Sequence, residues 1–213
     1  MKKSIITIYV GLTSLLFSAV PALAAPEERN HDLDELTFSE MLASVETGKG
    51  GDLIRQFQEK EARSKLSKNY QKNGTNLETC RNKEVLVLTI PADKLFAPND
   101  VELLPGVGEY LNPVKRYLRE PDMYRVLLVM HTDNTGSEVY REELTADRVE
   151  AVFDWFNNQG ADTSYMFAYS MADDMGIVPN TSMENRAKNR RLEIYLMPGS
   201  RMVKQASSGR IEF

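Results

Sequence analysis

The chain has 213 residues, with 26 lysines and arginines against 31 aspartates and glutamates, which gives a formal net charge of −5. An acidic chain without a block of basic residues is unsuited to the phosphate backbone, so nucleic acid is not expected as a partner. Cys80 is the only cysteine, which rules out an internal disulfide and favours a free, partly buried thiol over an intermolecular bridge.

The first 24 residues have the features of an export signal. Two lysines precede an apolar run from Ile5 to Val20, and Ala22-Leu23-Ala24 has the small-x-small pattern that precedes a signal peptidase cut. We therefore predict a cleaved signal peptide at residues 1–24. The alternative is an uncleaved membrane anchor, because the apolar run is only slightly shorter than the roughly 20 residues that a membrane span needs.

Residues 25–82 are strongly charged and only weakly periodic. We predict a short helix around Leu36 to Val45 and a second helix from Asp52, as its N-cap, to about Tyr70. The apolar stripe on these helices is too thin to form a core by itself. The segment is therefore expected to be an arm or spacer, either a solvated helix against the main domain or a docking segment.

Strands and helices alternate from about residue 83 onward. Glu84 to Ile90 is β-branched and apolar, which is typical of a strand, and Val107 to Leu118 has a helical spacing that Pro113 either kinks or restarts. Tyr124 to His131 is almost continuously apolar. A run of this kind predicts a parallel strand that is covered on both faces.

A helix is expected after the polar loop that follows His131. Thr145 is the predicted N-cap of this helix, and Gly160 is its predicted stop. Four apolar residues at helical spacing would form the face that it buries against the sheet: Val149, Val152, Phe153 and Phe156.

Three further elements complete the predicted domain. Residues 165–170 and 191–196 are expected strands, the second with one half-hydrated face, and residues 183–188 are an expected short helix. The order β-α-β-α-β-(α)-β predicts an α/β sandwich, in which a mixed sheet carries helices on one face and is preceded by the helical arm. This domain would cover residues 83–197, and residues 198–213 would be a mobile tail.

An acid and an arginine are predicted to lie close together at the carboxyl end of the central strand. Asp133 follows the buried strand, and Arg148 would be the third residue of the helix that Thr145 caps. A β-α turn brings the start of a helix back over the end of a strand, where ligands bind. The pair suits a zwitterion, with the ligand carboxylate at Arg148 and the helix N-terminus and the ligand ammonium at Asp133. A simple salt bridge between the two residues is the alternative.

The sequence lacks the residue patterns of a catalytic or metal site. His31 and His131 are the only histidines, which do not make a metal-binding set, and no serine or cysteine has an activated setting. We therefore predict a binding protein without a metal or cofactor, and not a hydrolase. His131 is expected to be a structural, hydrogen-bonding residue.

Two stretches of the chain carry a family pattern. They read MHTDNTGSEVYREELTADRVEAV, from Met130, and NRAKNRRLEIYL, from Asn185. Together they resemble the OmpA-like peptidoglycan-binding domain, whose pattern is roughly G-H-T-D-x-x-G, L-[ST]-x-x-R-A and N-R-R-[VL]-x-[IV]. The three blocks occur in order at the spacing of the family, within about residues 83–197.

The resemblance implies noncovalent binding of the peptidoglycan stem peptide through meso-diaminopimelate, whose free amino acid end is a zwitterion. The acid of H-T-D is Asp133, with Thr132 beside it, and the arginine of the second block is Arg148. From the third block, Arg190 is the arginine expected to reach the peptide. The polar residue that the family has after its first strand falls near Asp93.

The chain departs from the family pattern at three positions. Met130 replaces a glycine, Val149 replaces an alanine, and Arg141 stands where many members have an asparagine that contacts the ligand. The acid and the arginine of the pattern are kept, so peptidoglycan binding is still expected. The positive charge of Arg141 suggests a preference for stem peptides with an additional, unamidated carboxylate.

The resemblance also implies a periplasmic protein of a Gram-negative bacterium, associated with the outer membrane, that tethers the envelope or a partner to the cell wall. Residues 25–80 would then recruit a membrane or envelope partner. The alternative is an inner-membrane-anchored, stator-like protein in which the N-terminal helix stays uncleaved. Its apolar run lacks the carboxylate that proton-coupled relatives carry within the membrane, so energy coupling is not expected.

Overall fold

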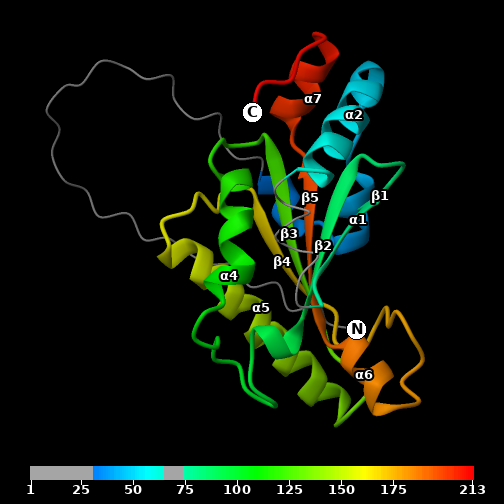
Figure 1. The fold of residues 1–213 in the computed structure, drawn as a ribbon, viewed down its shortest axis with the longest axis vertical. Helices are drawn as coiled ribbons and strands as arrows, with labels where there is room; N and C mark the ends of the chain where they lie inside the picture. The colour runs from blue at the N-terminus through cyan, green and yellow to red at the C-terminus, as the bar shows by residue number, and fades with distance from the viewer. Residues whose placement is uncertain (1–30, 65–73) are drawn as a thin grey trace, which may run out of the picture.

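Five strands form one mixed sheet in the order β1-β2-β5-β3-β4 (Figure 1). The computed structural model describes residues 31–64 and 74–213. β3 pairs in parallel with β4 and antiparallel with β5, while β2 pairs antiparallel with both β1 and β5. The strands are β1 (Asn76–Cys80), β2 (Val85–Pro91), β3 (Tyr124–His131), β4 (Met166–Ser170) and β5 (Arg191–Pro198).

The larger hydrophobic core lies between one face of this sheet and five helical segments. Ile54, Leu111, Val149 and Met202 are among the helical residues that are buried in it. The segments are α2 (Gly51–Ala62), α4 (Gly108–Leu111), the 3-10 helix η4 (Asn112–Leu118), α5 (Glu138–Asn158) and α7 (Ser200–Ser207). Pro113 lies in the first turn of the 3-10 helix η4, which follows directly on α4, so a new helical segment starts there.

The opposite face of the sheet is covered by the segment that precedes the domain. It contains the 3-10 helix η1 (His31–Glu35) and helix α1 (Phe38–Ala43), which Thr37 caps. Phe38 and Met41 are buried in a second hydrophobic cluster against the sheet, and the Phe38 and Tyr195 ring centroids lie 5.1 Å apart. The helices of the predicted domain therefore pack on one face of the sheet, as predicted, and α1 of the preceding arm covers the other face. The predicted half-hydrated face of the last strand is covered for the same reason.

Strand β3 is buried on both faces, as its apolar sequence predicts. Val126, Leu128 and Met130 lie in the larger core, while Leu127 and Val129 lie in the second cluster under α1. Burial of one such side chain stabilises a fold by about 1.5–3 kcal/mol. This strand is therefore firmly fixed, and so is the start of the loop that follows it.

Strand β1 was not predicted from the sequence. Its residues, NLETC, are largely exposed at the edge of the sheet, and Leu77 is the one that packs against the larger core. The tight turn from Arg81 to Lys83, in which all three residues have positive φ, returns the chain from β1 to β2. An edge strand with so few apolar contacts carries little of the apolar signal that identifies a buried strand. Cys80 ends β1 as a free, partly buried thiol.

The C-terminal residues form a packed helix, α7, so the prediction of a mobile tail after Pro198 was wrong. Met202 and Ala206 of α7 are buried in the larger core. Ala206 also meets the start of α2, because a Cβ added to Gly50 would lie 2.7 Å from the Ala206 Cβ. A side chain at position 50 would therefore collide with α7.

Alanine in place of Gly50 is expected to lower the free energy of unfolding by roughly 1 to 2 kcal/mol, because an extra methyl overpacks this helix contact. Gly50 has φ −84°, which alanine also adopts, so backbone strain does not contribute. Urea denaturation of the two proteins measures the difference. Alanine in place of the exposed neighbour Lys49 is the control, and an equal loss in both variants would contradict a steric cause.

The ends of three strands meet at one edge of the sheet. Pro91 of β2 and His131 of β3 are both register partners of Arg191, the first residue of β5. Two short helical elements follow or precede these ends: the 3-10 helix η3 (Ala92–Lys94) and α6 (Met183–Asn189), which lies at the bottom of Figure 1. This topology brings the regions of Asp93, Asp133 and Arg190 to the same place.

The predictions for the N-terminus lie largely outside the described residues. The predicted signal peptide and the alternative membrane anchor fall before residue 31. Between residues 31 and 64, and from residue 74 to the end, no helix combines the length and apolar character that crossing a bilayer requires. Within these ranges α2 ends at Ala62, earlier than the predicted end near Tyr70.

Candidate functional site

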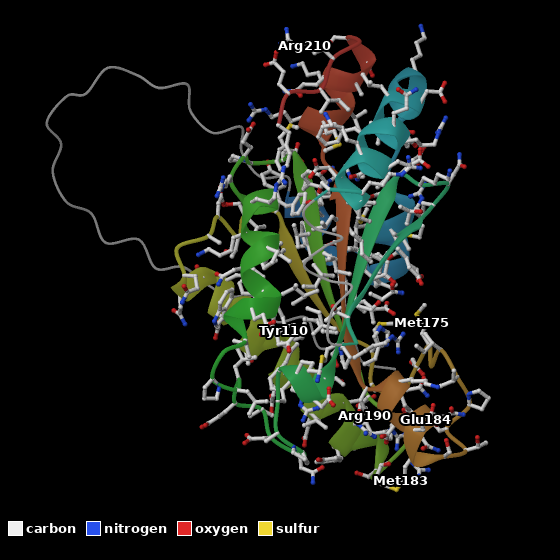
Figure 2. The ribbon with its side chains drawn as sticks, viewed as in Figure 1. Tyr110, Met175, Met183, Glu184, Arg190 and Arg210 are labelled. Atoms are coloured by element: carbon white, nitrogen blue, oxygen red, sulfur yellow. The ribbon has the colours of Figure 1, made fainter. Side chains whose placement is uncertain are left out.

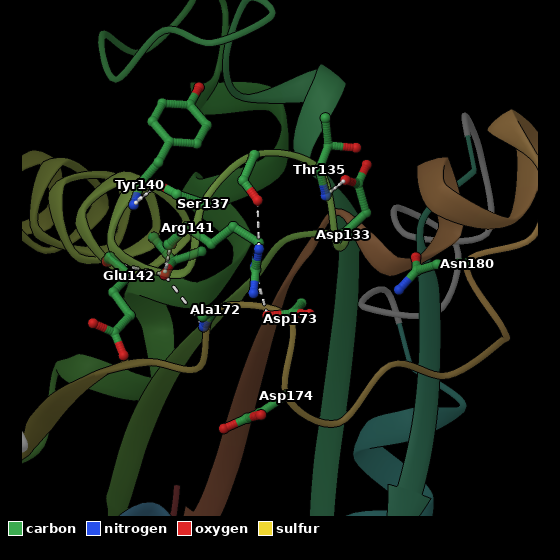
Figure 3. Close-up of polar contacts among 12 residues, drawn as sticks. Asp133, Thr135, Ser137, Tyr140, Arg141, Glu142, Ala172, Asp173, Asp174 and Asn180 are labelled. Atoms are coloured by element: carbon green, nitrogen blue, oxygen red, sulfur yellow. Dashed lines mark hydrogen bonds and ion pairs between the residues drawn. The ribbon is translucent and has the colours of Figure 1, made fainter. Parts of the chain in front are cut away.

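Asp133 is a buried carboxylate just beyond the end of β3. The residue is only 3% exposed, and its Oδ1 accepts a hydrogen bond of 2.8 Å from the Thr135 backbone N–H (Figure 3). Its Oδ2 pairs with the Arg190 guanidinium. Burial alone would raise the pKa of Asp133, but the hydrogen bonds from Thr135 and Arg190 hold this pKa below its ordinary value. Asp133 is therefore a negative charge at neutral pH.

Arg190 connects this acid to an open hollow in the surface. Arg190 is the C-cap of α6 and directly precedes β5. Its carbonyl accepts a hydrogen bond of 3.0 Å from the N–H of Ala92, which ties its backbone to the end of β2. Its side chain is 41% exposed and lies near Glu184 of α6 (Figure 2). The predicted residues Asp93 and Arg190 thus border one cavity of about 250 Å³, which is lined by Pro91, Asp93, Glu184, Ala187, Lys188 and Arg190.

Helix α5 begins earlier than predicted, which changes the setting of Arg148. Ser137 is the N-cap, and its hydroxyl accepts a hydrogen bond of 3.2 Å from Tyr140 N–H. Thr145 is buried inside the helix, and its hydroxyl donates to the Arg141 carbonyl at 2.8 Å. Arg148 is therefore the eleventh residue of the helix, counted from Glu138, and does not lie beside the helix N-terminus.

Arg148 is fixed by the loop that joins η3 to α4. Its Nε donates to the Asp100 carbonyl at 2.8 Å, and its Nη2 donates to the Ala97 carbonyl at 3.1 Å. The guanidinium carbon lies 4.8 Å from the centroid of the Phe96 ring, which is a cation-π contact. Burial is the main cause that lowers the pKa of Arg148, and the charge of Arg190 contributes in the same direction. Arg148 does not form the alternative salt bridge with Asp133, whose ion pair is with Arg190.

Both residues of the predicted pair, Asp133 and Arg148, are buried. Arg148 is only 4% exposed, almost as little as Asp133. In the part of the chain that the structure describes, Nη1 is the Arg148 nitrogen for which no hydrogen bond is found. The site therefore contains one buried acid that is paired with Arg190 at the surface, and the charge of Arg190 in turn acts on the fixed, buried Arg148.

Thr132 and Arg141 support the loops around this acid. The Thr132 N–H donates to the Ala172 carbonyl at 2.7 Å and ties the end of β3 to the loop after β4. Arg141 donates from Nε to Asp173 at 2.7 Å and from Nη1 to the Gly136 carbonyl at 2.6 Å (Figure 3). Its charge is already paired, which removes the basis for an expected preference for an additional ligand carboxylate. Asp173 was not identified from the sequence, since only the fold brings it opposite Arg141.

Residues 95–190 match the model of the OmpA family. This chain carries an OmpA-family domain. Among curated proteins, the probable lipoprotein YiaD of Escherichia coli is 27% identical over 71% of this chain and 66% of its own length. The peptidoglycan-binding protein ArfA of Mycobacterium tuberculosis is 34% identical over 47% of this chain and 31% of its own length. The chain thus spans about two thirds or less of these relatives.

Solved structures show the same fold as the OmpA-family domain of this chain. A putative MotB-like protein from Desulfovibrio vulgaris superposes with a TM-score of 0.61 at 26% identity, over 70% of this chain and 98% of that one. The cell wall anchor of the T6SS from Pseudomonas aeruginosa superposes with a TM-score of 0.56 at 26% identity, over 64% of this chain and 96% of that one. None of these four names describes a catalytic activity.

A buried network lies beneath the site of the OmpA-family domain. Arg191 donates from Nε to Glu193 at 2.7 Å and from its two terminal nitrogens to the Asn189 and Met175 carbonyls, each at 3.1 Å. His131 is 1% exposed, with Nε2 3.5 Å from Glu193 Oε2 and Nδ1 3.3 Å from the Asp174 carbonyl. These contacts hold the loop from β4 to α6 against the sheet, and they agree with the structural role predicted for His131.

Glu193 is expected to make the stability of the OmpA-family domain depend on acid pH. Burial alone would raise the pKa of Glu193, but its contacts with His131, Tyr195 and Arg191 lower this pKa from 4.5 to about 2. A lowered folded-state pKa contributes stability above pH 4.5, and this stability is lost as the pH falls toward 2. Glutamine in place of Glu193 should therefore cost roughly 2 kcal/mol at pH 7. It should also flatten the fall in stability between pH 5 and 2.5, as measured by urea denaturation.

Glutamine in place of Glu184 is the matched control for this experiment. Glu184 also has a lowered pKa, because Lys188 donates to it at 2.8 Å, but its side chain is 79% exposed. A surface pair of this kind contributes little to stability. The control should keep the wild-type pH dependence, and a Glu193 variant that did the same would contradict the assignment.

Proposed function

We propose that this protein binds peptidoglycan noncovalently, through the free amino acid end of a meso-diaminopimelate stem peptide. The observation that carries the proposal is the buried Asp133 carboxylate, which is paired with Arg190 in an OmpA-family domain; Arg190 in turn acts on the charge of the buried Arg148. The ligand ammonium would bind Asp133, and the ligand carboxylate would bind the two arginines. Charge-assisted hydrogen bonds of this kind are about twice as strong as neutral ones.

The other predicted site residues would serve this ligand in different ways. Asp93 borders the hollow beside Arg190 and would contact the more distant part of the peptide. Thr132 would keep Asp133 in place through its backbone bond to the next loop. Arg141, which is paired with Asp173, would shape the wall of the site and would not supply an unpaired charge.

The names of the relatives support the class of ligand. ArfA is named a peptidoglycan-binding protein, and the Pseudomonas structure is titled a cell wall anchor. YiaD is named a probable lipoprotein and a Bordetella avium relative an outer membrane protein, which fits an envelope location. We accordingly place this protein in the periplasm, associated with the outer membrane, where it would tether the envelope or a partner to the cell wall.

Sedimentation with purified cell-wall sacculi tests the proposed binding. The full chain should be pulled down by sacculi that contain meso-diaminopimelate, and free meso-diaminopimelate should release it. Sacculi with lysine at the same position of the stem peptide are the control, because they lack the second carboxylate. A protein that stays in the supernatant with both kinds of sacculi would overturn the proposal.

The N-terminal segment is proposed to recruit a membrane or envelope partner. Helices α1 and α2 are part of the folded core, so deleting residues 25–80 would disrupt the fold. Alanine at the exposed positions Glu46, Lys49 and Lys60 is a better test. A pull-down that recovered the same partners with this variant would argue against recruitment through these positions.

The inner-membrane-anchored alternative differs in the fate of residues 1–24. The N-terminal sequence of the exported protein separates the two possibilities. A start at Ala25 would exclude the anchor, whereas a start at Met1 would support it.

A further inference from the structure

Both carboxylate oxygens of Asp133 are occupied. Oδ1 accepts the Thr135 N–H, and Oδ2 pairs with Arg190. The Asp133 side chain is 4% exposed, whereas the Arg190 side chain is 41% exposed, so the guanidinium is the member of the pair that faces solvent. A ligand ammonium that is to bind Asp133 must therefore compete with the Arg190 guanidinium.

Arg190 combines a fixed backbone with a side chain that has room to move. Its N–H donates to the Arg186 carbonyl at 3.1 Å, and its carbonyl accepts from Ala92 at 3.0 Å. The preceding residue, Asn189, is fully buried, and its side chain is hydrogen-bonded to the loop at Ile177 and Val178. The long, exposed side chain borders the open hollow, and none of these backbone hydrogen bonds involves its guanidinium.

Arg148 cannot take over this movement. Its guanidinium is held by two backbone carbonyls and by the Phe96 ring, and it is buried. The positive charge of Arg190 acts on Arg148, which places the two guanidinium groups near one another. The site therefore has one fixed cation, one cation with freedom to move, and the buried acid with which that cation is paired; Asp93 and Glu184 are further acids that line the hollow.

We propose that Arg190 is a counter-ion that the ligand exchanges. The ligand ammonium replaces the guanidinium on Asp133, and the released guanidinium binds the ligand carboxylate together with Arg148. This inference rests on the proposed peptidoglycan binding and names the residue that sets its selectivity. A ligand that carries only an amine must break the ion pair without offering Arg190 a new partner. A ligand that carries both charges restores every contact that it breaks.

The exchange predicts a selectivity that two tripeptides can measure. L-Ala-γ-D-Glu-meso-diaminopimelate and L-Ala-γ-D-Glu-L-Lys both carry an amine at the end of the third side chain, and only the first also carries a carboxylate there. The full wild-type chain should bind the first about 100-fold more tightly in calorimetric titrations, since loss of one partner of a charge pair commonly costs this much.

Alanine in place of Arg190 gives opposite results for the two tripeptides. The diaminopimelate peptide should bind about 10-fold more weakly, because it loses one cation. The lysine peptide should bind about 5- to 10-fold more tightly, because Asp133 no longer has a counter-ion to displace. A purely static contact between Arg190 and the ligand carboxylate would not produce this gain. A lysine peptide that binds the variant no more tightly than it binds the wild type would overturn the exchange.

Two further variants complete the test. Alanine in place of Lys49 removes an exposed cation that does not line the hollow, and should leave lysine-peptide binding unchanged. A gain in this variant would attribute the effect to overall charge and would also overturn the exchange. Lysine in place of Arg190 keeps a cation and should restore most of the selectivity, which checks the proposal if the alanine variant folds poorly. If the wild type binds neither peptide, the proposed function fails; if it binds as expected without a gain on removal of Arg190, only the exchange fails.

Discussion

Asparagine in place of Asp133 is expected to weaken binding of the diaminopimelate tripeptide by roughly 2–4 kcal/mol, or about 30- to 1,000-fold in the dissociation constant. Asp133 is the one acid that pairs directly with Arg190 at the site, and its lowered pKa keeps it charged at neutral pH. The amide has nearly the same shape and can still accept the Thr135 N–H, but it has no charge to hold the ligand ammonium. Calorimetric titration gives the affinity, and sedimentation with sacculi gives the same comparison on the natural polymer.

Asparagine in place of Asp147 is the matched control for this change. Asp147 is an exposed acid on α5, next to Arg148 in sequence, so the control removes one negative charge from the same helix. Its affinity should stay within about twofold of the wild type, because exposed charges interact weakly in water. If urea denaturation shows that the Asp133 variant is folded, and the variant still binds like the wild type, the buried acid is not the ammonium site.

Buried strands were the part of the fold that the sequence predicted best. β2, β3, β4 and β5 all contain apolar runs, and β3 is covered on both faces as expected. β1 and α7 were missed for one physical reason. Each places few side chains in the hydrophobic clusters, Leu77 and Cys80 in β1 and Met202, Val203 and Ala206 in α7, so the apolar pattern is too weak to recognise.

The start of α5 was missed because its first two turns face solvent. The residues from Glu138 to Glu143 are mostly charged or exposed, and the first buried apolar residue of the helix is Leu144. The apolar pattern of the helix therefore starts only at Leu144, which is why Thr145 was predicted as the cap. Ser137, the actual cap, is a residue type that favours this position, and that local signal could have identified it.

The predicted site residues converge, but their individual contacts were not predictable. Asp133 and Arg190 form an ion pair, and Arg190 and Asp93 border one hollow, because three strand ends meet there. Arg148 instead bonds to the carbonyls of Ala97 and Asp100. Every residue has a backbone carbonyl, so the sequence cannot indicate which of them a buried arginine will select.

Alanine in place of Arg148 is expected to reduce both binding and stability. Loss of the fixed cation should weaken binding of the diaminopimelate tripeptide by roughly 2–4 kcal/mol. The Ala97 and Asp100 carbonyls lose their donors and Phe96 loses its cation-π partner, which should lower the free energy of unfolding by about 2 kcal/mol. Urea denaturation measures the loss of stability. Calorimetric titration, under conditions in which the variant is folded, measures the loss of affinity.

Two variants separate the charge of Arg148 from the position of its loop. Lysine in place of Arg148 keeps a cation but cannot reproduce the planar fork, so it should recover less than half of the lost affinity. Phenylalanine in place of Tyr140 removes the 3.1 Å bond from its hydroxyl to Asn99 and leaves the guanidinium untouched. That change should cost about 0.5–1 kcal/mol of stability and little affinity. If loss of the Tyr140 hydroxyl weakened binding as much as loss of Arg148, the loop would be the binding element, and the guanidinium would act only by holding it in place.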